Sequence, residues 1–438
     1  MKNVLAGSRC SWDAITARVM DVYGDFGLPP YELSWDQLKE VVIIASSSRG
    51  GSSFFAELLR SASELLHFRA EINPFLKLAG LAYPDSGTGS DALDARHAAH
   101  GGAFLKFCAG DVGQRAPSPV DGGDWERFAR QLYWRLTLQW PALDIGFKQV
   151  RQWLAAALAE SPDDVQRLLI VFLHYAHTAY PQINPYFYDL NAALIKALCP
   201  DIRAPTDTPD GVLIEEPPFI NVLPWQSVTT LDRPLVIKTP SNAFRLPFFR
   251  ALFPRARLRI LHLKRNPAAA VTGLYDGWRH HGFFSHRVAR PLRIRGYSDV
   301  LPQYGRQWWK FDLPPGWEAW TERSLLEVCG FQWRSAHEAV LEYVDQQNVD
   351  YFSLFFEDLV GDTPRRGEVI DALAQWLNVS PVNMYRSITA MPRIMSTRVP
   401  YPGRWREYEE TLAPVLDDPH LLNVTERLGY DLSRRNWI

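Results

Sequence analysis

The pattern of apolar and polar residues is most informative between positions 41 and 60. An uninterrupted apolar run, mostly β-branched, extends from Val41 to Ala45 and is typical of a buried strand. A polar Ser/Gly segment follows, and the next apolar residues recur at helical spacing: Phe54, Phe55, Leu58 and Leu59. The pattern therefore predicts a strand, a tight loop and a helix in succession.

Further apolar runs predict more strands, and one long region predicts helices. The strands are expected to begin near residues 65, 234, 257 and 350. Residues 124–199 place Trp, Phe and Leu at helical spacing. We therefore expect an N-terminal extension at 1–40 and a single domain at 41–438. Within that domain, 85–230 is expected to form a mainly helical insertion that covers the site as a lid or acceptor wall.

The loop after the first strand has the composition of an anion-binding site. Gly50 and Gly51 let the backbone approach a ligand closely, and the following helix directs its positive end at the same point. Ser52 and Ser53 add hydroxyl groups, and Arg49 adds a planar donor pair for oxyanions. The structural alternative is a Ser/Gly turn that only joins a strand to a helix.

The same loop lacks the features of a nucleoside triphosphate P-loop. When Gly51 is aligned with the second glycine of that motif, Ser46 occupies the position of its first glycine. Ser52 then occupies the position of its phosphate-binding lysine. The loop is therefore not expected to bind the γ-phosphate of a nucleoside triphosphate.

Composition narrows the class of protein. The 438 residues are 47% hydrophobic and 22% charged, which indicates a globular core. The net charge of −2 and the lack of a basic run argue against a nucleic-acid partner. The scattered cysteines predict no metal site. Without a signal sequence or an 18-residue apolar run, we expect a cytoplasmic protein that does not insert into membranes. The 16 Trp residues suggest a bulky, apolar acceptor pocket, with an aromatic-rich core as the alternative.

Five short motifs resemble those of the sulfotransferases that use 3′-phosphoadenosine 5′-phosphosulfate (PAPS), and they occur in the order found in that family. Between about residues 41 and 412 they are Arg49-Gly-Gly-Ser-Ser, strand-end Lys238, Arg265-Asn-Pro, Phe356-Glu-Asp-Leu and Gly403-Arg-Trp-Arg. The region 85–230 is largely unmatched. The resemblance implies an α/β fold with a P-loop-like central parallel sheet flanked by helices.

The resemblance also implies roles for individual residues. Glu71, twenty-two residues after Arg49, matches the general base of several branches, with a histidine near His280 as the alternative. Arg49 and Lys238 match groups that stabilise the transferring and leaving groups. The serine that the family places eight residues after Arg265 is replaced by Gly273, with Thr272 one residue earlier. The implied cosubstrate-binding set is Ser48, Arg49, Gly50, Gly51, Ser52, Ser53, Lys238, Arg265, Thr272, Gly273, Arg398 and Arg404.

The sequence therefore predicts transfer of a sulfuryl group from PAPS, without a metal, to a hydroxyl or amine of a small hydrophobic acceptor such as a natural-product intermediate. Two alternatives remain at this stage. One is a P-loop phosphotransferase or kinase, which needs a phosphate-binding lysine that this loop lacks. The other is a non-catalytic nucleotide-binding protein, which Gly273 favours. Neither the identity of the acceptor nor the oligomeric state follows from the sequence.

Overall fold

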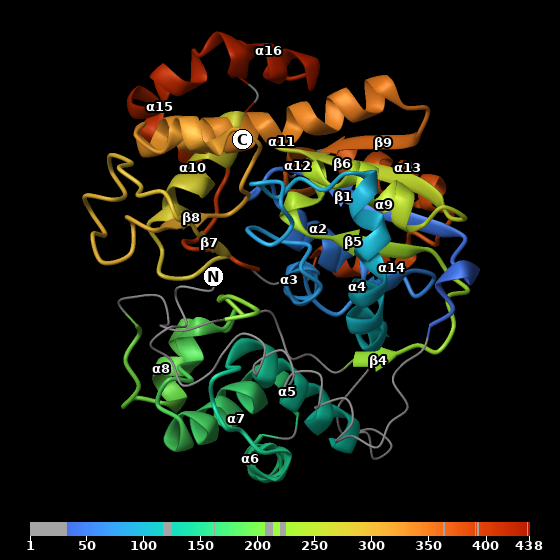
Figure 1. Ribbon diagram of the computed structural model, residues 1–438, viewed down its shortest axis with the longest axis vertical. Helices are drawn as coiled ribbons and strands as arrows, with labels where there is room; N and C mark the ends of the chain where they lie inside the picture. Colours follow the sequence, from blue (N-terminus) through green and yellow to red (C-terminus); the bar gives the residue numbers. More distant parts are fainter. Residues whose placement is uncertain are drawn as a thin grey trace.

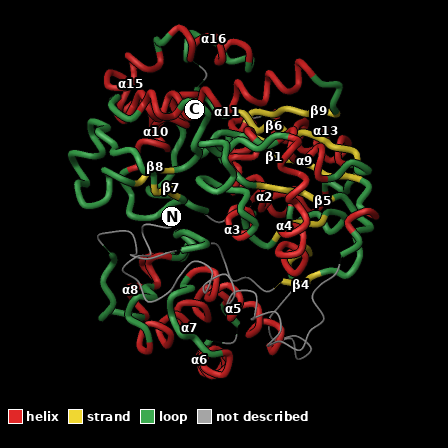
Figure 2. The backbone as a smooth tube through the Cα atoms, viewed as in Figure 1, coloured by secondary structure: helices red, strands yellow, loops and turns green. Residues whose placement is uncertain are grey.

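Strand β1 (Glu40–Ala45) is the middle one of five parallel strands in a seven-stranded sheet (Figures 1 and 2). The computed structural model describes residues 33–116, 125–161, 163–205, 213–219, 225–361, 364–389, 391, 394–435 and 437–438. Most of the expected N-terminal extension, 1–32, lies outside the described residues. In spatial order the strands are β4 (Trp225–Ser227), β3 (Val112–Arg115), β2 (Leu66–Phe68), β5 (Leu235–Lys238), β1, β6 (Arg257–Lys264) and β9 (Asp350–Phe355). Strand β3 is antiparallel to both of its neighbours.

The order of the five parallel strands places a topological switch point beside β1. Numbered along the chain, they lie in the order 2-3-1-4-5. From β1 the chain runs to β2, which lies toward one edge of the sheet. From the neighbouring strand β6 it runs to β9, which lies at the opposite edge. Open α/β sheets bind ligands where neighbouring connections diverge in this way, at the carboxyl ends of the strands. The segments after β1 and β6 therefore flank the expected ligand position.

Both faces of β1 are buried, which explains its continuous apolar sequence. Val41, Ile43 and Ala45 belong to the large core that includes α3 (Asn73–Leu78), α9 (Leu246–Leu252) and α11 (Leu325–Gln346). Val42 and Ile44 pack in a second core with α2 (Ser52–Leu59), α13 (Arg365–Leu377) and α14 (Val382–Thr389). The predicted α/β class and the strand–loop–helix at 41–59 are confirmed.

Residues 85–230 add both helices and sheet strands. The helices are α4 (Gly101–Cys108), α5 (Trp125–Gln139), α6 (Phe147–Glu160), α7 (Val165–Ala179) and α8 (Ala192–Leu198). Helices α5 to α8 gather below the sheet in the view of Figure 1. The fully buried Arg135 of α5 pairs with Asp111 and Glu215 at 2.5 and 3.3 Å. Because a buried charge is costly unless paired, these ion pairs hold α5 against the segments that lead to β3 and β4.

Most of the remaining elements contribute to a third core together with residues of α11. The helices are α10 (Pro267–Trp278), α12 (Phe356–Val360), α15 (Glu409–Leu416) and α16 (Pro419–Arg427), and a small hairpin is made by β7 (Ser285–Arg287) and β8 (Trp308–Lys310). Single 3₁₀ turns lie at Trp35–Gln37, Ala95–His100, Ala109–Asp111, Pro185–Phe187, Pro240–Phe244, Trp317–Trp320 and Arg404–Tyr408. Among the described helices, none has the length and apolar character needed to cross a bilayer.

Candidate active site

The loop between β1 and α2 is tightly constrained. Arg49 and Gly51 both have positive φ, at 62° and 90°. A Cβ atom on Gly50 would overlap Ser46 Oγ and the Ser47 carbonyl, and one on Gly51 would overlap the ring of Phe356. Left-handed backbone at a residue other than glycine is uncommon and concentrates at functional sites. The space around the loop therefore requires both glycines, and at Gly51 the left-handed conformation requires glycine as well.

Gly51→Ala is expected to lower the free energy of unfolding by about 2–5 kcal/mol. About 1–2 kcal/mol of this comes from the left-handed conformation, and about 1–3 kcal/mol from overlap with Phe356. Gly80→Ala is the matched control, because Gly80 has φ 70° and no neighbour within 4 Å of an added Cβ. Urea unfolding of both variants measures the difference. Equal losses would contradict a role for the packing of Phe356 on the loop.

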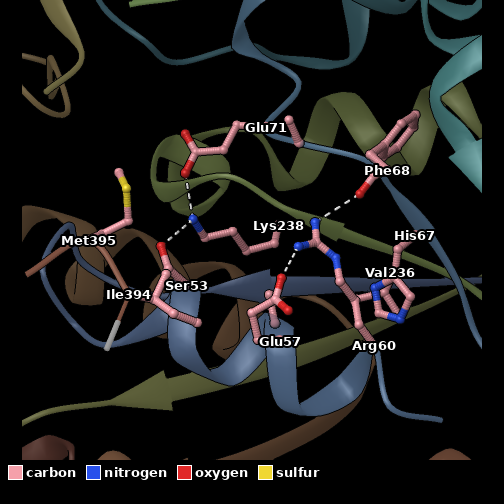
Figure 3. A pocket seen from close by; sticks show the side chains of 12 residues that line it. Ser53, Glu57, Arg60, His67, Phe68, Glu71, Val236, Lys238, Ile394 and Met395 are labelled. Atoms are coloured by element: carbon pink, nitrogen blue, oxygen red, sulfur yellow. Dashed lines mark hydrogen bonds and ion pairs between the residues drawn. The ribbon is translucent and has the colours of Figure 1, made fainter. Parts of the chain in front are cut away.

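Three predicted residues meet at the carboxyl ends of β1, β2 and β5. Lys238 Nζ, at the end of β5, donates to Ser53 Oγ at 3.0 Å and to Glu71 Oε1 at 2.5 Å (Figure 3). The side chains of Lys238 and Glu71 are 10% and 18% exposed. The Ile72 N–H donates to Thr239 Oγ1 at 3.1 Å, which ties the segment after β2 to the segment after β5. Glu71 and Lys238 therefore form one charged pair beside the loop.

Arg265 lies against the same loop on its other side. Its Nη1 donates to the carbonyl of Arg49 at 2.8 Å, and its guanidinium lies 5.1 Å from the centre of the Phe356 ring. Glu357 Oε1 accepts the N–H of Asn266 at 2.8 Å, so it holds the turn that begins α10. Phe356 and Glu357 of the Phe-Glu-Asp-Leu motif thus support both predicted anion-binding segments.

Arg49 and Arg265 form a buried positive cluster. Burial and repulsion from Arg265 lower the pKa of Arg49 to about 10, and burial also lowers the pKa of Arg265. Both groups stay charged at neutral pH. Arg49 Nε is buried without a hydrogen-bond partner in the described part of the chain, while its Nη1 donates to the Met395 carbonyl at 2.5 Å. A buried donor of this kind favours an anionic ligand, because leaving it unpaired is costly.

The other two predicted arginines are connected to this cluster through a carboxylate. Arg404 Nη2 lies 2.8 Å and Arg398 Nε 4.0 Å from Asp276 Oδ2 of α10. Arg398 also donates to the Tyr408 hydroxyl at 3.0 Å. Arg398 is exposed, whereas the side chain of Arg404 is 17% exposed. Asp276 therefore holds Arg404 near Arg49 and Arg265. The positive charge of Arg404 repels those of the other two arginines and contributes to their lowered pKa values.

Thr272 and Gly273 lie on α10 and differ in their surroundings. The Thr272 hydroxyl donates to the Ala268 carbonyl at 2.7 Å and the residue is 2% exposed. A Cβ atom on Gly273 would lie 3.3 Å from Arg49 Cβ. The Thr272 hydroxyl proton is thus used inside the helix, and the missing side chain of Gly273 gives Arg49 its space.

The histidine alternative for the base is weakened by its environment. Burial and the nearby charges of His281, Lys310 and Arg49 lower the pKa of His280 to about 3. A general base works best when its pKa lies near the operating pH. His280 is therefore neutral at physiological pH but a poor proton acceptor.

The sequence motifs did not point to several groups around the site. Met395 accepts from Arg49 through its carbonyl and donates its N–H to Asp189 at 3.0 Å. Asp189 and Asp276 both lie close enough to affect the pKa of Arg49. A cavity of about 30 Å³ separates Met395 and Ile394 from Lys238 and Glu71 (Figure 3). These groups come from distant segments and carry no local motif. Only their position in the fold reveals them. Within the described residues, no three His, Cys, Asp or Glu side chains are arranged to hold a metal ion.

Fold and site together define an α/β protein with a cluster of cationic side chains at the carboxyl ends of its parallel strands. No protein-family model matches the sequence, and no curated protein matches it. Among solved structures, it is similar to the "Sulfotransferase Domain from the Synechococcus PCC 7002 Olefin Synthase", with 13% identity, a TM-score of 0.35, and coverage of 90% of this chain and 96% of that chain.

A second similar structure is the "Sulfotransferase Domain from the Curacin Biosynthetic Pathway", with 12% identity, a TM-score of 0.34, and coverage of 90% and 99%. Both structures are named as sulfotransferase domains. At this identity and TM-score they assign no substrate or residue role to this chain.

Proposed function

We propose that this protein is a PAPS-dependent sulfotransferase. The main observation is that two cationic segments lie against each other, Ser48–Ser53 after β1 and Arg265 after β6. They meet at the point where the connections of the sheet diverge. Beside them lies a carboxylate–ammonium pair, Glu71 and Lys238. Two anion-binding segments and an adjacent proton acceptor suit a cosubstrate that carries two separate anionic groups.

The residues present fit such a cosubstrate. Ser47 Oγ and Arg49 Nε are buried donors without a partner among the described residues. Gly50 and Gly51 let the loop pack closely against Ser46, Ser47 and Phe356, where added Cβ atoms would overlap. The loop of Ser48, Arg49, Gly50, Gly51, Ser52 and Ser53, together with Lys238, would hold the 5′-phosphosulfate. Arg265 and Arg404, with Arg398 at the rim, would hold the 3′-phosphate.

The chain's own residues then have distinct tasks. PAPS supplies a sulfuryl group on a phosphate leaving group. Glu71 accepts the proton of the acceptor hydroxyl or amine as the new bond to sulfur forms and the bond from sulfur to the bridging oxygen breaks. Lys238 and Arg49 stabilise the charge on the transferring group and on the departing phosphate. The products are the sulfated acceptor and 3′-phosphoadenosine 5′-phosphate (PAP), with the proton on Glu71.

The lining of the cavity is consistent with a small acceptor that is partly apolar. Phe68, Val236, Ile394 and Met395 lie around Glu71 and Lys238 (Figure 3). An anion on the loop would compete with the Met395 carbonyl for Arg49. Binding of the cosubstrate is therefore expected to displace Met395 and enlarge the cavity in front of Glu71.

Calorimetric titration with PAP tests this function. PAP is expected to bind without a metal and more tightly than ATP with Mg²⁺. Arg265→Ala should weaken PAP by about 10–100-fold, because a hydrogen bond to a charged group contributes about 1.5–3 kcal/mol. Arg257→Ala is the control: Arg257 lies at the other end of β6 and is 63% exposed.

A preference for ATP with Mg²⁺ would instead support a phosphotransferase. The absence of binding to either nucleotide would contradict the proposal. Equal weakening by the Arg257 and Arg265 substitutions would show that the effect is not local to the proposed 3′-phosphate site.

A further inference from the structure

A buried polar network contacts the loop that joins β1 to α2, which is called the anion loop below. Asp312, which follows β8, accepts the N–H of Ser48 at 3.2 Å through Oδ2. Its Oδ1 lies 3.1 Å from Ser241 Oγ, which lies 2.8 Å from Asp91 Oδ2. Asp312, Asp91 and Ser241 are only 1%, 2% and 1% exposed. Two carboxyl groups thus share one hydroxyl in a solvent-excluded space.

The hydrogen bonds of this network require a proton on one of its two carboxyl groups. The Ser241 hydroxyl carries one hydrogen but faces a carboxyl oxygen on each side. Asp91 has other partners: Arg245 Nη2 and the Leu313 N–H donate to it at 3.3 and 2.9 Å, and His286 Nε2 lies 3.3 Å from its Oδ2. Within the described residues, the Asp312 carboxyl contacts Ser48 and Ser241. All contacts are satisfied when Asp312 carries a proton on Oδ1, Ser241 accepts it, and Ser241 donates to Asp91.

The electrostatic environment supports this assignment. Burial, followed by the negative charge of Asp91, raises the pKa of Asp312 to about 6. Burial also acts to raise the pKa of Asp91, but His286 and Arg245 outweigh it and hold that pKa well below its usual value. The proton of the pair therefore resides on Asp312, which is neutral below about pH 6 and negative above it.

Other charged groups around the network have their own partners. Lys310 Nζ, two residues before Asp312, donates to the carbonyls of His280 and Gly282. Arg245 Nη1 donates to Asn73 Oδ1 at 2.8 Å, and the negative charge of Glu71 favours the charged form of Arg245. The Arg49 guanidinium stacks on Phe283 at 4.8 Å. The Ser48 N–H thus connects Asp312 to the loop that would hold the phosphosulfate.

We propose that Asp312 is a positioning residue of the anion loop, and that the loop takes its anion when Asp312 is protonated. Neutral Asp312 still accepts the Ser48 N–H, so it holds the loop in shape without placing a negative charge behind it. Ionised Asp312 opposes an anion across a buried, low-dielectric gap. Binding of the cosubstrate is therefore coupled to proton uptake. This inference rests on the proposed function, because it concerns the same loop.

The test is calorimetric titration with PAP at pH 5.5, 7.0 and 8.5, in two buffers of different ionisation enthalpy. Wild-type affinity is expected to fall about tenfold or more between pH 5.5 and 8.5, with proton uptake that increases as pH rises above 6. Asp312→Asn mimics the protonated state, since its amide accepts from Ser48 and donates to Ser241. It should remove this uptake. The phosphates of PAP titrate equally in both proteins, so the ratio of the two affinities isolates Asp312.

The control is Glu338→Gln on α11, because burial also raises the pKa of Glu338 but this residue pairs with Arg334 on the same helix. It should leave the pH profile unchanged. A ratio of wild-type to Asp312→Asn affinity that does not change with pH would overturn the inference while leaving the proposed function intact. Failure of wild type to bind PAP at any pH would instead overturn the proposed function.

Ser241→Ala provides a second route if Asp312→Asn does not fold. The Ser241 hydroxyl accepts from neutral Asp312, but when Asp312 ionises it turns its hydrogen from Asp91 to Asp312, and this hydrogen bond lowers the pKa of Asp312. Its removal should therefore raise the pH at which PAP affinity begins to fall. A profile that coincides with wild type would overturn the inference.

Discussion

Glu71→Gln is expected to lower the rate of sulfuryl transfer by about 10²–10⁴-fold, while PAP affinity stays within about threefold of wild type. Glutamine keeps the size of the side chain and an oxygen that accepts from Lys238, which lies 2.5 Å from Glu71 Oε1. It cannot take the proton of the acceptor. The measurement is PAP release from PAPS in the presence of a panel of phenols and primary alcohols, together with calorimetric titration of PAP.

Glu216→Gln is a matched control, because Glu216 is also a buried glutamate paired with a lysine, Lys77. Its substitution should leave the rate within a few-fold of wild type. Unchanged activity in Glu71→Gln would show that another group is the base. Loss of PAP binding in the same variant would show that Glu71 shapes the anion site and does not only accept a proton.

Lys238→Met is expected to lower the rate by about 10²–10³-fold, the usual effect of removing one preorganised donor from a transition state. Methionine keeps the unbranched shape but removes the ammonium group that contacts Ser53 and Glu71. Because Lys238 would act on charge that develops during transfer, the loss should appear mainly in kcat. The measurement is steady-state PAP release with varied PAPS.

Lys77→Met is the control for this substitution, since Lys77 is similarly buried, at 11% exposure against 10%, but pairs with Glu216. It should leave kcat within a few-fold of wild type. A rise in KM for PAPS with unchanged kcat would contradict the assigned role, because it would show that Lys238 binds the ground state and transition state equally.

The local sequence was sufficient to predict the centre of the fold. The apolar run at 41–45 and the helical spacing after 53 depend on neighbouring residues alone, and the structure confirms both. Glu71, Lys238 and Arg265 could be expected near the loop for a further reason. Each follows a predicted parallel strand, and the carboxyl ends of such strands lie along one edge of the sheet. The structure places all three there.

Motif spacing could not predict what each side chain contacts. Thr272 belonged to the implied cosubstrate-binding set, and in the structure its hydroxyl donates to a carbonyl of its own helix. Gly273 appeared as the loss of a serine, whereas its lack of a side chain accommodates Arg49. The orientation of a residue on α10 depends on how that helix packs against the loop, and the sequence of the helix does not contain this information.

By itself, the sequence determined the five parallel strands, the loop and helix after the first of them, and the residue types at the strand ends, because these depend on local periodicity and backbone preference. The tertiary structure alone decided the partners of those residues. Asp276 reaches Arg404, the Met395 carbonyl reaches Arg49, and Asp312 reaches Ser48 across 264 positions of chain. Burial then sets their charge states, because desolvation and nearby charges shift a pKa only after distant segments have packed together.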